Sequence, residues 1–178
     1  MKRFLFIMGL TSIMGSGVFA QEAAVVDFAF LHKWYNPDTV VGLRVGIPWA
    51  ESDSVTGIDI GFYGKAKNMA GIQINLAANI VTDRADAIQI ACYNYAGNLS
   101  GAQFGLLNNI DNGALGWDTT LMFAACVQVG LVNKANYLRG VQVGLVNSAE
   151  LLYGFQVGLV NVIRSGTIPF MPIVNIGF

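Results

Sequence analysis

The sequence predicts an all-β protein built from repeats, and two observations support this fold class. A short apolar cassette, Gly-Val-Gln-Val-Gly-Leu-Val-Asn in its clearest copy at residues 140–147, recurs along the chain at steps of 15, 14, 16, 14, 25, 14 and 14 residues. Within each cassette apolar residues alternate with other residues at the period of two that is typical of a strand. A fixed period indicates one structural unit copied along the chain. The eight copies begin at Gly42, Gly57, Gly71, Ala87, Gly101, Cys126, Gly140 and Gly154.

Each predicted strand has two different faces. One face carries apolar, mostly β-branched residues, as in Val141, Val143 and Leu145, which favours strands over helices. The other face carries glycine and a recurring glutamine, with Arg44 and Asp59 in place of the glutamine in the first two copies. The glutamines are Gln73, Gln89, Gln103, Gln128, Gln142 and Gln156.

Short polar segments connect the cassettes and are expected to form turns. Asparagine ends five of the units, at positions 94, 108, 133, 147 and 161, and asparagine suits turns because it tolerates left-handed backbone geometry. The step of 25 residues requires an insertion, which residues 109–123 supply. Segments 24–30 and 172–178 are predicted to add a first and a last strand to the array.

The first twenty residues are predicted to be a secretory signal peptide. Lys2 and Arg3 precede an apolar stretch, and small residues lead to a cleavage site after Ala20. The apolar stretch is shorter than the roughly 20 residues that a membrane-spanning helix needs. We therefore expect residues 21–178 to form a single exported β domain.

The composition excludes one class of partner and favours contact with an apolar environment. Charged residues make up 12% of the chain, compared with about 25% in typical soluble domains. The formal net charge of −1 gives no basic surface for nucleic acid. Because no segment after residue 20 is long enough for a helical span, we expect any membrane contact to be made by strands.

Two architectures fit the repeat. In an antiparallel up-and-down β-barrel, which is the expected fold, each cassette would be one transmembrane strand with its apolar face toward lipid and the Gln/Gly face lining the interior. Eight cassettes and two terminal strands would give a barrel of about ten strands. In the alternative, a β-solenoid of 14-residue coils, the apolar face would be the core and the Gln/Gly face would be solvated. The near-identity of successive units favours the solenoid.

Catalytic and metal chemistry find little support in the sequence. His32 is the single histidine and has no suitably spaced ligand partners, and no Gly-x-Ser-x-Gly nucleophile motif occurs. Carboxylates such as Asp111 and Glu150 fall in predicted turns, where solvated charge is expected. Cys92 and Cys126 lie on opposite faces of the repeat, so we expect two small buried thiols and no disulfide. No enzyme, no cofactor and no metal site is predicted.

The cassette together with residues 148–150 resembles the bacterial surface repeat-containing proteins, which are built on tandem Gly-x-Gln-x-Gly-Leu-x-Asn units. The likeness covers residues 57–178 and is strongest after Cys126. The C-terminal strand ending in Phe178 also looks like the assembly signal of outer-membrane β-barrel proteins, although Pro172 weakens that likeness. The resemblance implies an exported protein of the outer membrane or cell surface of a Gram-negative bacterium. It supplies no catalytic or ligand residues.

The function expected from the sequence is that of a small structural protein of the outer membrane, with the lipid bilayer as its partner. The alternative is a solenoid binding module that presents either the Gln/Gly face or the loop at 109–120 to a protein or glycan. The candidate contact residues are Gln128, Gln142, Gln156 and Trp117.

Overall fold

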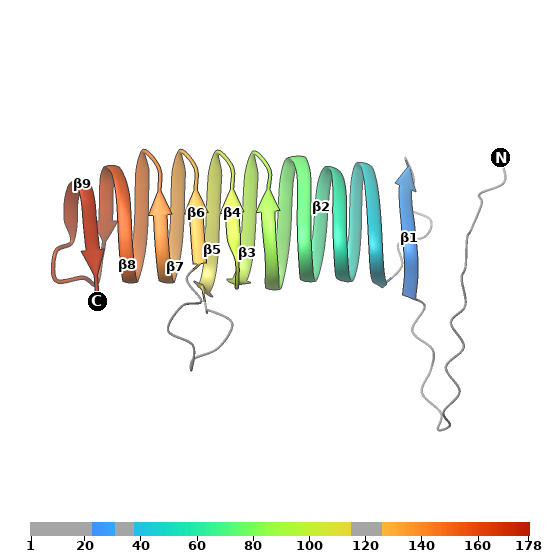
Figure 1. The fold of residues 1–178 in the computed structure, drawn as a ribbon, viewed down its shortest axis with the longest axis horizontal. Coiled ribbons are helices and arrows are strands. Elements are labelled where there is room, and N and C mark those ends of the chain that lie inside the picture. The colour runs from blue at the N-terminus through green and yellow to red at the C-terminus, as the bar shows by residue number, and fades with distance from the viewer. Residues whose placement is uncertain (1–22, 31–37, 115–125) are drawn as a thin grey trace, which may run out of the picture.

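The protein is a β-solenoid, in which the chain winds in successive coils around one long axis (Figure 1). The computed structural model describes residues 23–30, 38–114 and 126–178. These residues form one nine-stranded sheet and contain no helix. The predicted signal peptide, His32 and Trp117 lie outside the described residues.

The strands follow the coils, and several of them run around a corner without interruption. The first strand is β1 (Ala23–Phe30), and the next, β2 (Thr39–Ile90), contains 52 residues and winds through several coils. The remaining strands are β3 (Tyr93–Leu99), β4 (Ala102–Phe104), β5 (Leu107–Ala114), β6 (Cys126–Val129), β7 (Val132–Val143), β8 (Val146–Ile163) and β9 (Phe170–Gly177).

Parallel pairing between successive coils establishes the solenoid. In β7 and β8, Gly140 pairs with Gly154 and Gln142 pairs with Gln156, so equivalent residues of neighbouring cassettes lie side by side. An up-and-down barrel would require antiparallel neighbours, so the prediction of a barrel is wrong and the alternative solenoid of 14-residue coils is the observed fold. The all-β fold class is confirmed. Near-identical cassettes stack in parallel because like residues then meet like residues on every coil.

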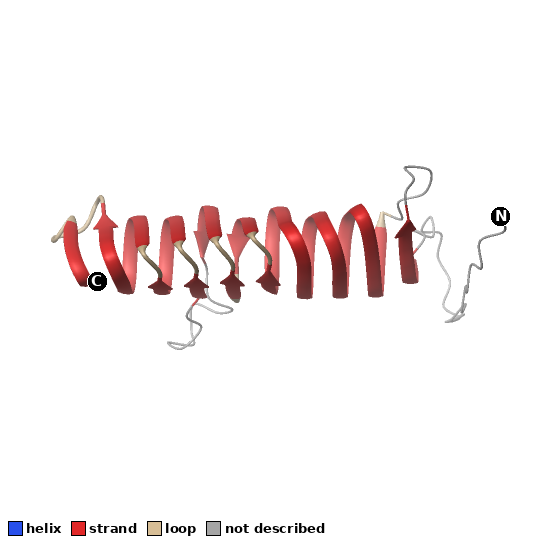
Figure 2. Ribbon diagram, turned by 90° about the horizontal axis from the view of Figure 1, so that it is seen from above, coloured by secondary structure: helices blue, strands red, loops and turns tan. Residues whose placement is uncertain are grey.

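The two ends of the solenoid differ. β1 adds to the first coil in parallel, with Phe28 beside Val45, whereas β9 runs antiparallel to β8, with Val174 beside Val157. Both terminal strands were predicted from the sequence. The reversal at β9 ends the parallel stack at the C-terminal end of the sheet (Figure 2).

The long step between the fifth and sixth cassettes leaves the coil intact. Leu107 pairs with Val132 and Ala114 pairs with Leu138, so residues 101–114 form one regular coil. The next cassette then begins at Cys126, which pairs with Gly140. The extra residues of this step are therefore 115–125, which lie outside the described residues, and not the predicted 109–123. Residues 109–114 belong to strand β5, so the first part of the contact loop predicted at 109–120 is a strand.

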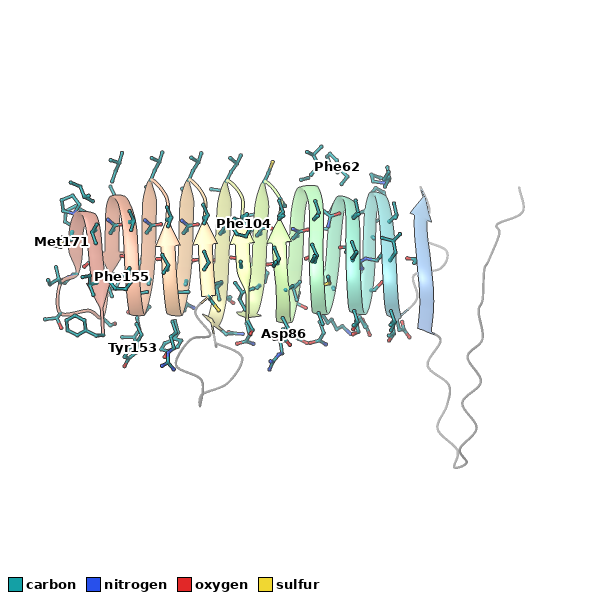
Figure 3. All side chains as sticks on the ribbon, in the orientation of Figure 1. Phe62, Asp86, Phe104, Tyr153, Phe155 and Met171 are labelled. Atoms are coloured by element: carbon teal, nitrogen blue, oxygen red, sulfur yellow. The ribbon has the colours of Figure 1, made fainter. Side chains whose placement is uncertain are left out.

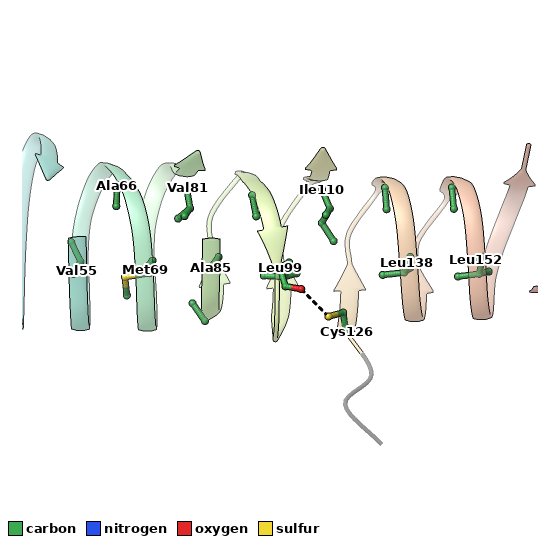
Figure 4. Packing of buried hydrophobic residues seen from close by; sticks show 14 of the residues in the cluster. Val55, Ala66, Met69, Val81, Ala85, Leu99, Ile110, Cys126, Leu138 and Leu152 are labelled. Carbon is green, nitrogen blue, oxygen red and sulfur yellow. Dashed lines mark hydrogen bonds between the residues drawn. The ribbon is translucent and has the colours of Figure 1, made fainter. Parts of the chain in front are cut away.

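The interior is divided into an apolar half and an amide half. The apolar half contains one leucine or similar side chain and one alanine in most coils, such as Leu138 and Ala135 or Leu152 and Ala149 (Figure 4). The amide half contains the glutamines and asparagines of the cassettes, all of them buried. The Gln/Gly face is therefore the inside of the coil, which corrects the expectation that a solenoid would expose it.

Candidate functional site

Six glutamines form a continuous hydrogen-bonded row inside the solenoid, here called the Gln row: Gln73, Gln89, Gln103, Gln128, Gln142 and Gln156. Each Nε2 after the first donates to the Oε1 of the glutamine one coil earlier, at 2.7 to 3.0 Å. The second hydrogen of each amide is directed to a backbone carbonyl, as from Gln128 to Lys134 at 3.2 Å. Parallel strands about 4.8 Å apart bring identical amides within bonding distance on every coil.

A second row, the Asn row, runs beside the first and in the opposite direction. Each Nδ2 except that of the last member donates to the Oδ1 one coil later, at 2.8 to 2.9 Å. Its members are Asn79, Asn94, Asn108, Asn133, Asn147 and Asn161. The last five were predicted to be turn residues, but the structure places them inside strands β3, β5, β7 and β8. The same Nδ2 atoms also donate to a backbone carbonyl, as Asn133 Nδ2 does to the Val143 oxygen at 2.9 Å.

Both rows meet at a buried ion pair near the N-terminal end. The Asp59 carboxylate accepts from Gln73 at 2.9 Å and from Asn75 at 3.2 Å. Asn75 also donates to Oδ1 of Asn79, the first member of the Asn row, at 2.7 Å. Arg44 donates to both carboxylate oxygens at 2.8 Å, and both side chains are completely buried. Because a carboxylate only accepts, Gln73 must turn its NH₂ group toward Asp59, and this fixes the donor direction of the whole Gln row.

Glycine leaves the space in which these rows lie. At Gly144 an added Cβ would lie 2.4 Å from the Gly130 carbonyl oxygen and 2.6 Å from Nδ2 of Asn133. The first residue of most cassettes has a positive φ, which is +149° at Gly140, and its Cβ would lie 1.9 Å from the Cys126 oxygen. Glycine at these positions is thus required by the close approach of successive coils.

The outer surface over the amide half is apolar and exposed. We call it the apolar band and define it as the second, fourth, sixth and seventh positions of the cassettes from residue 57 to residue 160, none of which is charged. Leu145 is 49% exposed and Leu159 is 66% exposed. The band includes these exposed large residues: Ile58, Ile60, Phe62, Ile72, Ile74, Leu76, Ile88, Ile90, Phe104, Leu106, Leu107, Leu131, Val132, Val143, Leu145, Val146, Phe155, Val157, Leu159 and Val160.

Charged side chains gather away from the band. Figure 3 shows Phe62 at one edge of the solenoid and Asp86 and Tyr153 at the opposite edge. Lys65 pairs with Glu51 at 2.7 Å and Lys67 pairs with Asp53 at 2.9 Å, between neighbouring coils. The hydrogen bond and charge of each carboxylate raise the pKa of the lysine that it contacts. The solenoid is therefore amphipathic in cross-section, with an apolar edge and a charged edge.

The two cysteines occupy different environments. Cys126 replaces a cassette glycine and is buried, with its thiol 3.3 Å from the Leu99 oxygen, and burial raises the pKa of this thiol. Cys92 is exposed in the sixth cassette position, where other coils carry leucine or phenylalanine. Both thiols are free, so the expectation of two buried thiols is correct for Cys126 and wrong for Cys92.

The predicted contact glutamines are inaccessible. Gln128, Gln142 and Gln156 have no exposed surface, and their amides are used within the Gln row. The structure therefore contradicts a module that presents the Gln/Gly face to a partner. The apolar band is the face that the barrel prediction directed outward and the solenoid alternative placed in the core. The observed solenoid therefore has the inside and outside that were expected of the barrel.

The described residues hold no group of three or more metal-ligating side chains, and no helix among them is long and apolar enough to cross a membrane. Comparison of the chain with protein-family models, with curated proteins and with solved structures finds no match.

Proposed function

We propose that this protein is a non-catalytic repeat module of the bacterial cell envelope that binds an apolar partner surface through the apolar band. The observation that carries the proposal is the arrangement of polarity. Amides fill the half of the interior beneath the band, while valine, isoleucine and leucine cover the outside. Sequences that fold in water alone bury such residues in preference to amides.

The extent of the band supports a binding role. The seven coils of the band, each about 4.8 Å thick, give it a length of roughly 34 Å, and its apolar rows are uninterrupted along it. Monomeric soluble proteins rarely expose contiguous apolar patches larger than a few hundred Å², and larger patches mark interaction sites. Removing one half-exposed leucine or isoleucine from water contributes about 1 kcal/mol, so several rows together give a strong driving force.

The interior supports a scaffold and no catalysis. The titratable pair in the amide half, Arg44 and Asp59, is saturated by its own contacts and by the two amide rows. A solenoid of this kind is stabilised by contacts between neighbouring coils, which keep the exposed rows straight. Export by the predicted signal peptide would bring this scaffold to the envelope.

Expression of the full chain in a Gram-negative host, followed by cell fractionation, tests the proposal. We expect removal of the first twenty residues, measured by mass spectrometry, and recovery of the chain with the envelope fraction. The variant Leu131→Asp should move the chain toward the soluble periplasmic fraction, whereas Asn68→Asp, which adds the same charge at an exposed site away from the band, should not. The proposal would be refuted if the parent chain and both variants were recovered to the same extent in the soluble fraction.

A further inference from the structure

The apolar band extends around the outer corner of the coils, where an open groove over the glycines runs between its fourth-position and sixth-position side chains. Its second and fourth cassette positions lie on one flank, as with Val141 and Val143, and its seventh position lies on the next flank, as with Val146. Leu145 lies between them at the bend, where the strands β7 and β8 are interrupted. A partner that covers the whole band must therefore contact the edge from both sides.

We propose that this partner is the hydrocarbon of a lipid bilayer, with the solenoid axis lying along the membrane. The row of sixth-position side chains at the bend, which includes Leu131, Leu145 and Leu159 and is here called the leucine edge, is inserted into one leaflet. The inference rests on the proposed function, because it names the partner of the apolar band. A fluid hydrocarbon can cover both flanks of this corner and fill the open groove between them, whereas a rigid protein surface must be shaped to match the flanks and the groove at once.

The backbone of the leucine edge satisfies the main requirement of hydrocarbon, which is that no amide is left without a partner. At the bend, Gly144 N donates to Val157 O at 3.0 Å, and Leu145 N and Val146 N both donate to Leu131 O at 3.0 and 2.9 Å. The preceding coil repeats the pattern at Gly130, whose amide donates to the Val143 oxygen at 3.0 Å. A turn in water could leave these amides to solvent, but here neighbouring coils pair them.

A second copy of the chain fits the band less well. One flank is about four residues wide, or roughly 13 Å, and about 34 Å long, which gives about 450 Å² per copy and about 900 Å² in a face-to-face dimer. Stable interfaces bury about 1,200–2,000 Å², and this dimer would still leave the leucine edge in water.

The dimensions also favour one leaflet over a span. From the second to the sixth cassette position the apolar flank measures about 13 Å, which is close to half of a hydrocarbon core about 30 Å thick. Charged residues such as Lys134 and Glu150 lie beyond the band and would face the headgroups and water. No position of the apolar band that would face the hydrocarbon carries a charged side chain, and the Arg44–Asp59 pair is enclosed within the coil.

Cys92 provides a natural probe of this orientation, because it is exposed on the leucine edge while Cys126 is buried. The full chain, exported and purified in mild detergent, is labelled with nitrobenzoxadiazole and reconstituted with phosphatidylcholine vesicles. We expect the chain to float with the vesicles, and the Cys92 label to be quenched by doxyl lipids and protected from iodide. A label on Glu150→Cys, in a Cys92→Leu background, should show the reverse.

Paired variants measure the contribution of the band itself. Leu145→Asp should weaken partition into vesicles at least tenfold, and Asn68→Asp should stay within twofold of the parent chain. Both sites are exposed, so far-UV circular dichroism should show the same β structure in each variant. Because the contact is apolar, raising the salt concentration from 50 to 500 mM should leave partition unchanged to about twofold.

The outcomes separate this inference from the proposed function. If the chain does not float, but forms an oligomer in which the Cys92 label is protected from iodide, the lipid partner is wrong and binding through the band stands. If the Cys92 label stays accessible to iodide in every preparation, both proposals are wrong. Flotation with both labels accessible would overturn insertion of the leucine edge.

Discussion

Replacement of Gln128 by leucine tests whether the Gln row stabilises the fold. Gln128 donates to Oε1 of Gln103 at 2.9 Å and accepts from Nε2 of Gln142 at 2.7 Å. The variant Gln128→Leu keeps a side chain of similar volume but removes both contacts, together with the hydrogen bond from Nε2 to the Lys134 oxygen. It leaves one buried oxygen and one buried N–H without a partner, in a site closed to water.

The expected loss of stability follows from these two groups. A buried polar group left without its hydrogen bond costs about 1–3 kcal/mol, so Gln128→Leu should lower the free energy of unfolding by about 3 kcal/mol. Gln156→Leu should cost about 1 kcal/mol or less. It leaves the Gln142 oxygen without a donor, but it also removes the Gln156 oxygen, which has no hydrogen-bond partner among the described residues.

The measurement is urea unfolding of the full chain in mild detergent, followed by far-UV circular dichroism. Asn161→Leu in the same terminal coil is the control, because Asn161 accepts from Asn147 at 2.8 Å and donates to the oxygens of Gly158 and Met171. Asn161→Leu should lower the free energy of unfolding about as much as Gln128→Leu does. That result would show that the assay detects damage in the terminal coil. Equal effects of Gln128→Leu and Gln156→Leu would refute the reasoning.

Three further predictions concern the thiols, the glycines and the ion pair. At pH 8 one thiol per native chain, that of Cys92, should react with a maleimide, because Cys126 is buried and its raised pKa keeps it protonated. In urea both thiols should react, and mass spectrometry counts the attached labels. Gly140→Ala should prevent folding or cost several kcal/mol, because the added Cβ would collide with the preceding coil. In the same unfolding assay Gly113→Ala should be neutral or stabilise by about 0.5 kcal/mol, because its Cβ would meet ordinary contacts at 3.6 Å. Asp59→Asn should cost about 3–5 kcal/mol because it leaves a buried guanidinium without its counter-charge, and a loss below 1 kcal/mol would contradict that view.

The repeat itself could be predicted from the sequence because period and alternation are local properties. The cassette starts, the terminal strands and the regular 14-residue coil all follow from residue spacing, and the structure confirms them. The positive φ of the first cassette position, at Gly140 and Gly154, was not predicted from the sequence.

The inside of the coil could not be predicted from one cassette. In isolation a glutamine or an asparagine has unsatisfied amide groups and is expected to face water, which is why the solenoid alternative predicted a solvated Gln/Gly face. The barrel prediction placed the same face inside. Gln142 becomes fully satisfied only when identical side chains stack on the coils before and after it. The available signal was the joint recurrence of Gln and Asn at the same spacing, as in Gln128 with Asn133 and Gln142 with Asn147.

The opposite directions of the Gln row and the Asn row have a consequence for how the protein can grow. In each row the amide dipoles point the same way, so a single long row would accumulate partial charge at its two ends, as a helix does. Because the two rows run antiparallel, every added coil contributes a pair of opposed dipoles that largely cancel. A gene duplication that inserts one more cassette therefore lengthens the solenoid without an electrostatic penalty that increases with its length, and Asp59 continues to set the direction for all the coils that follow.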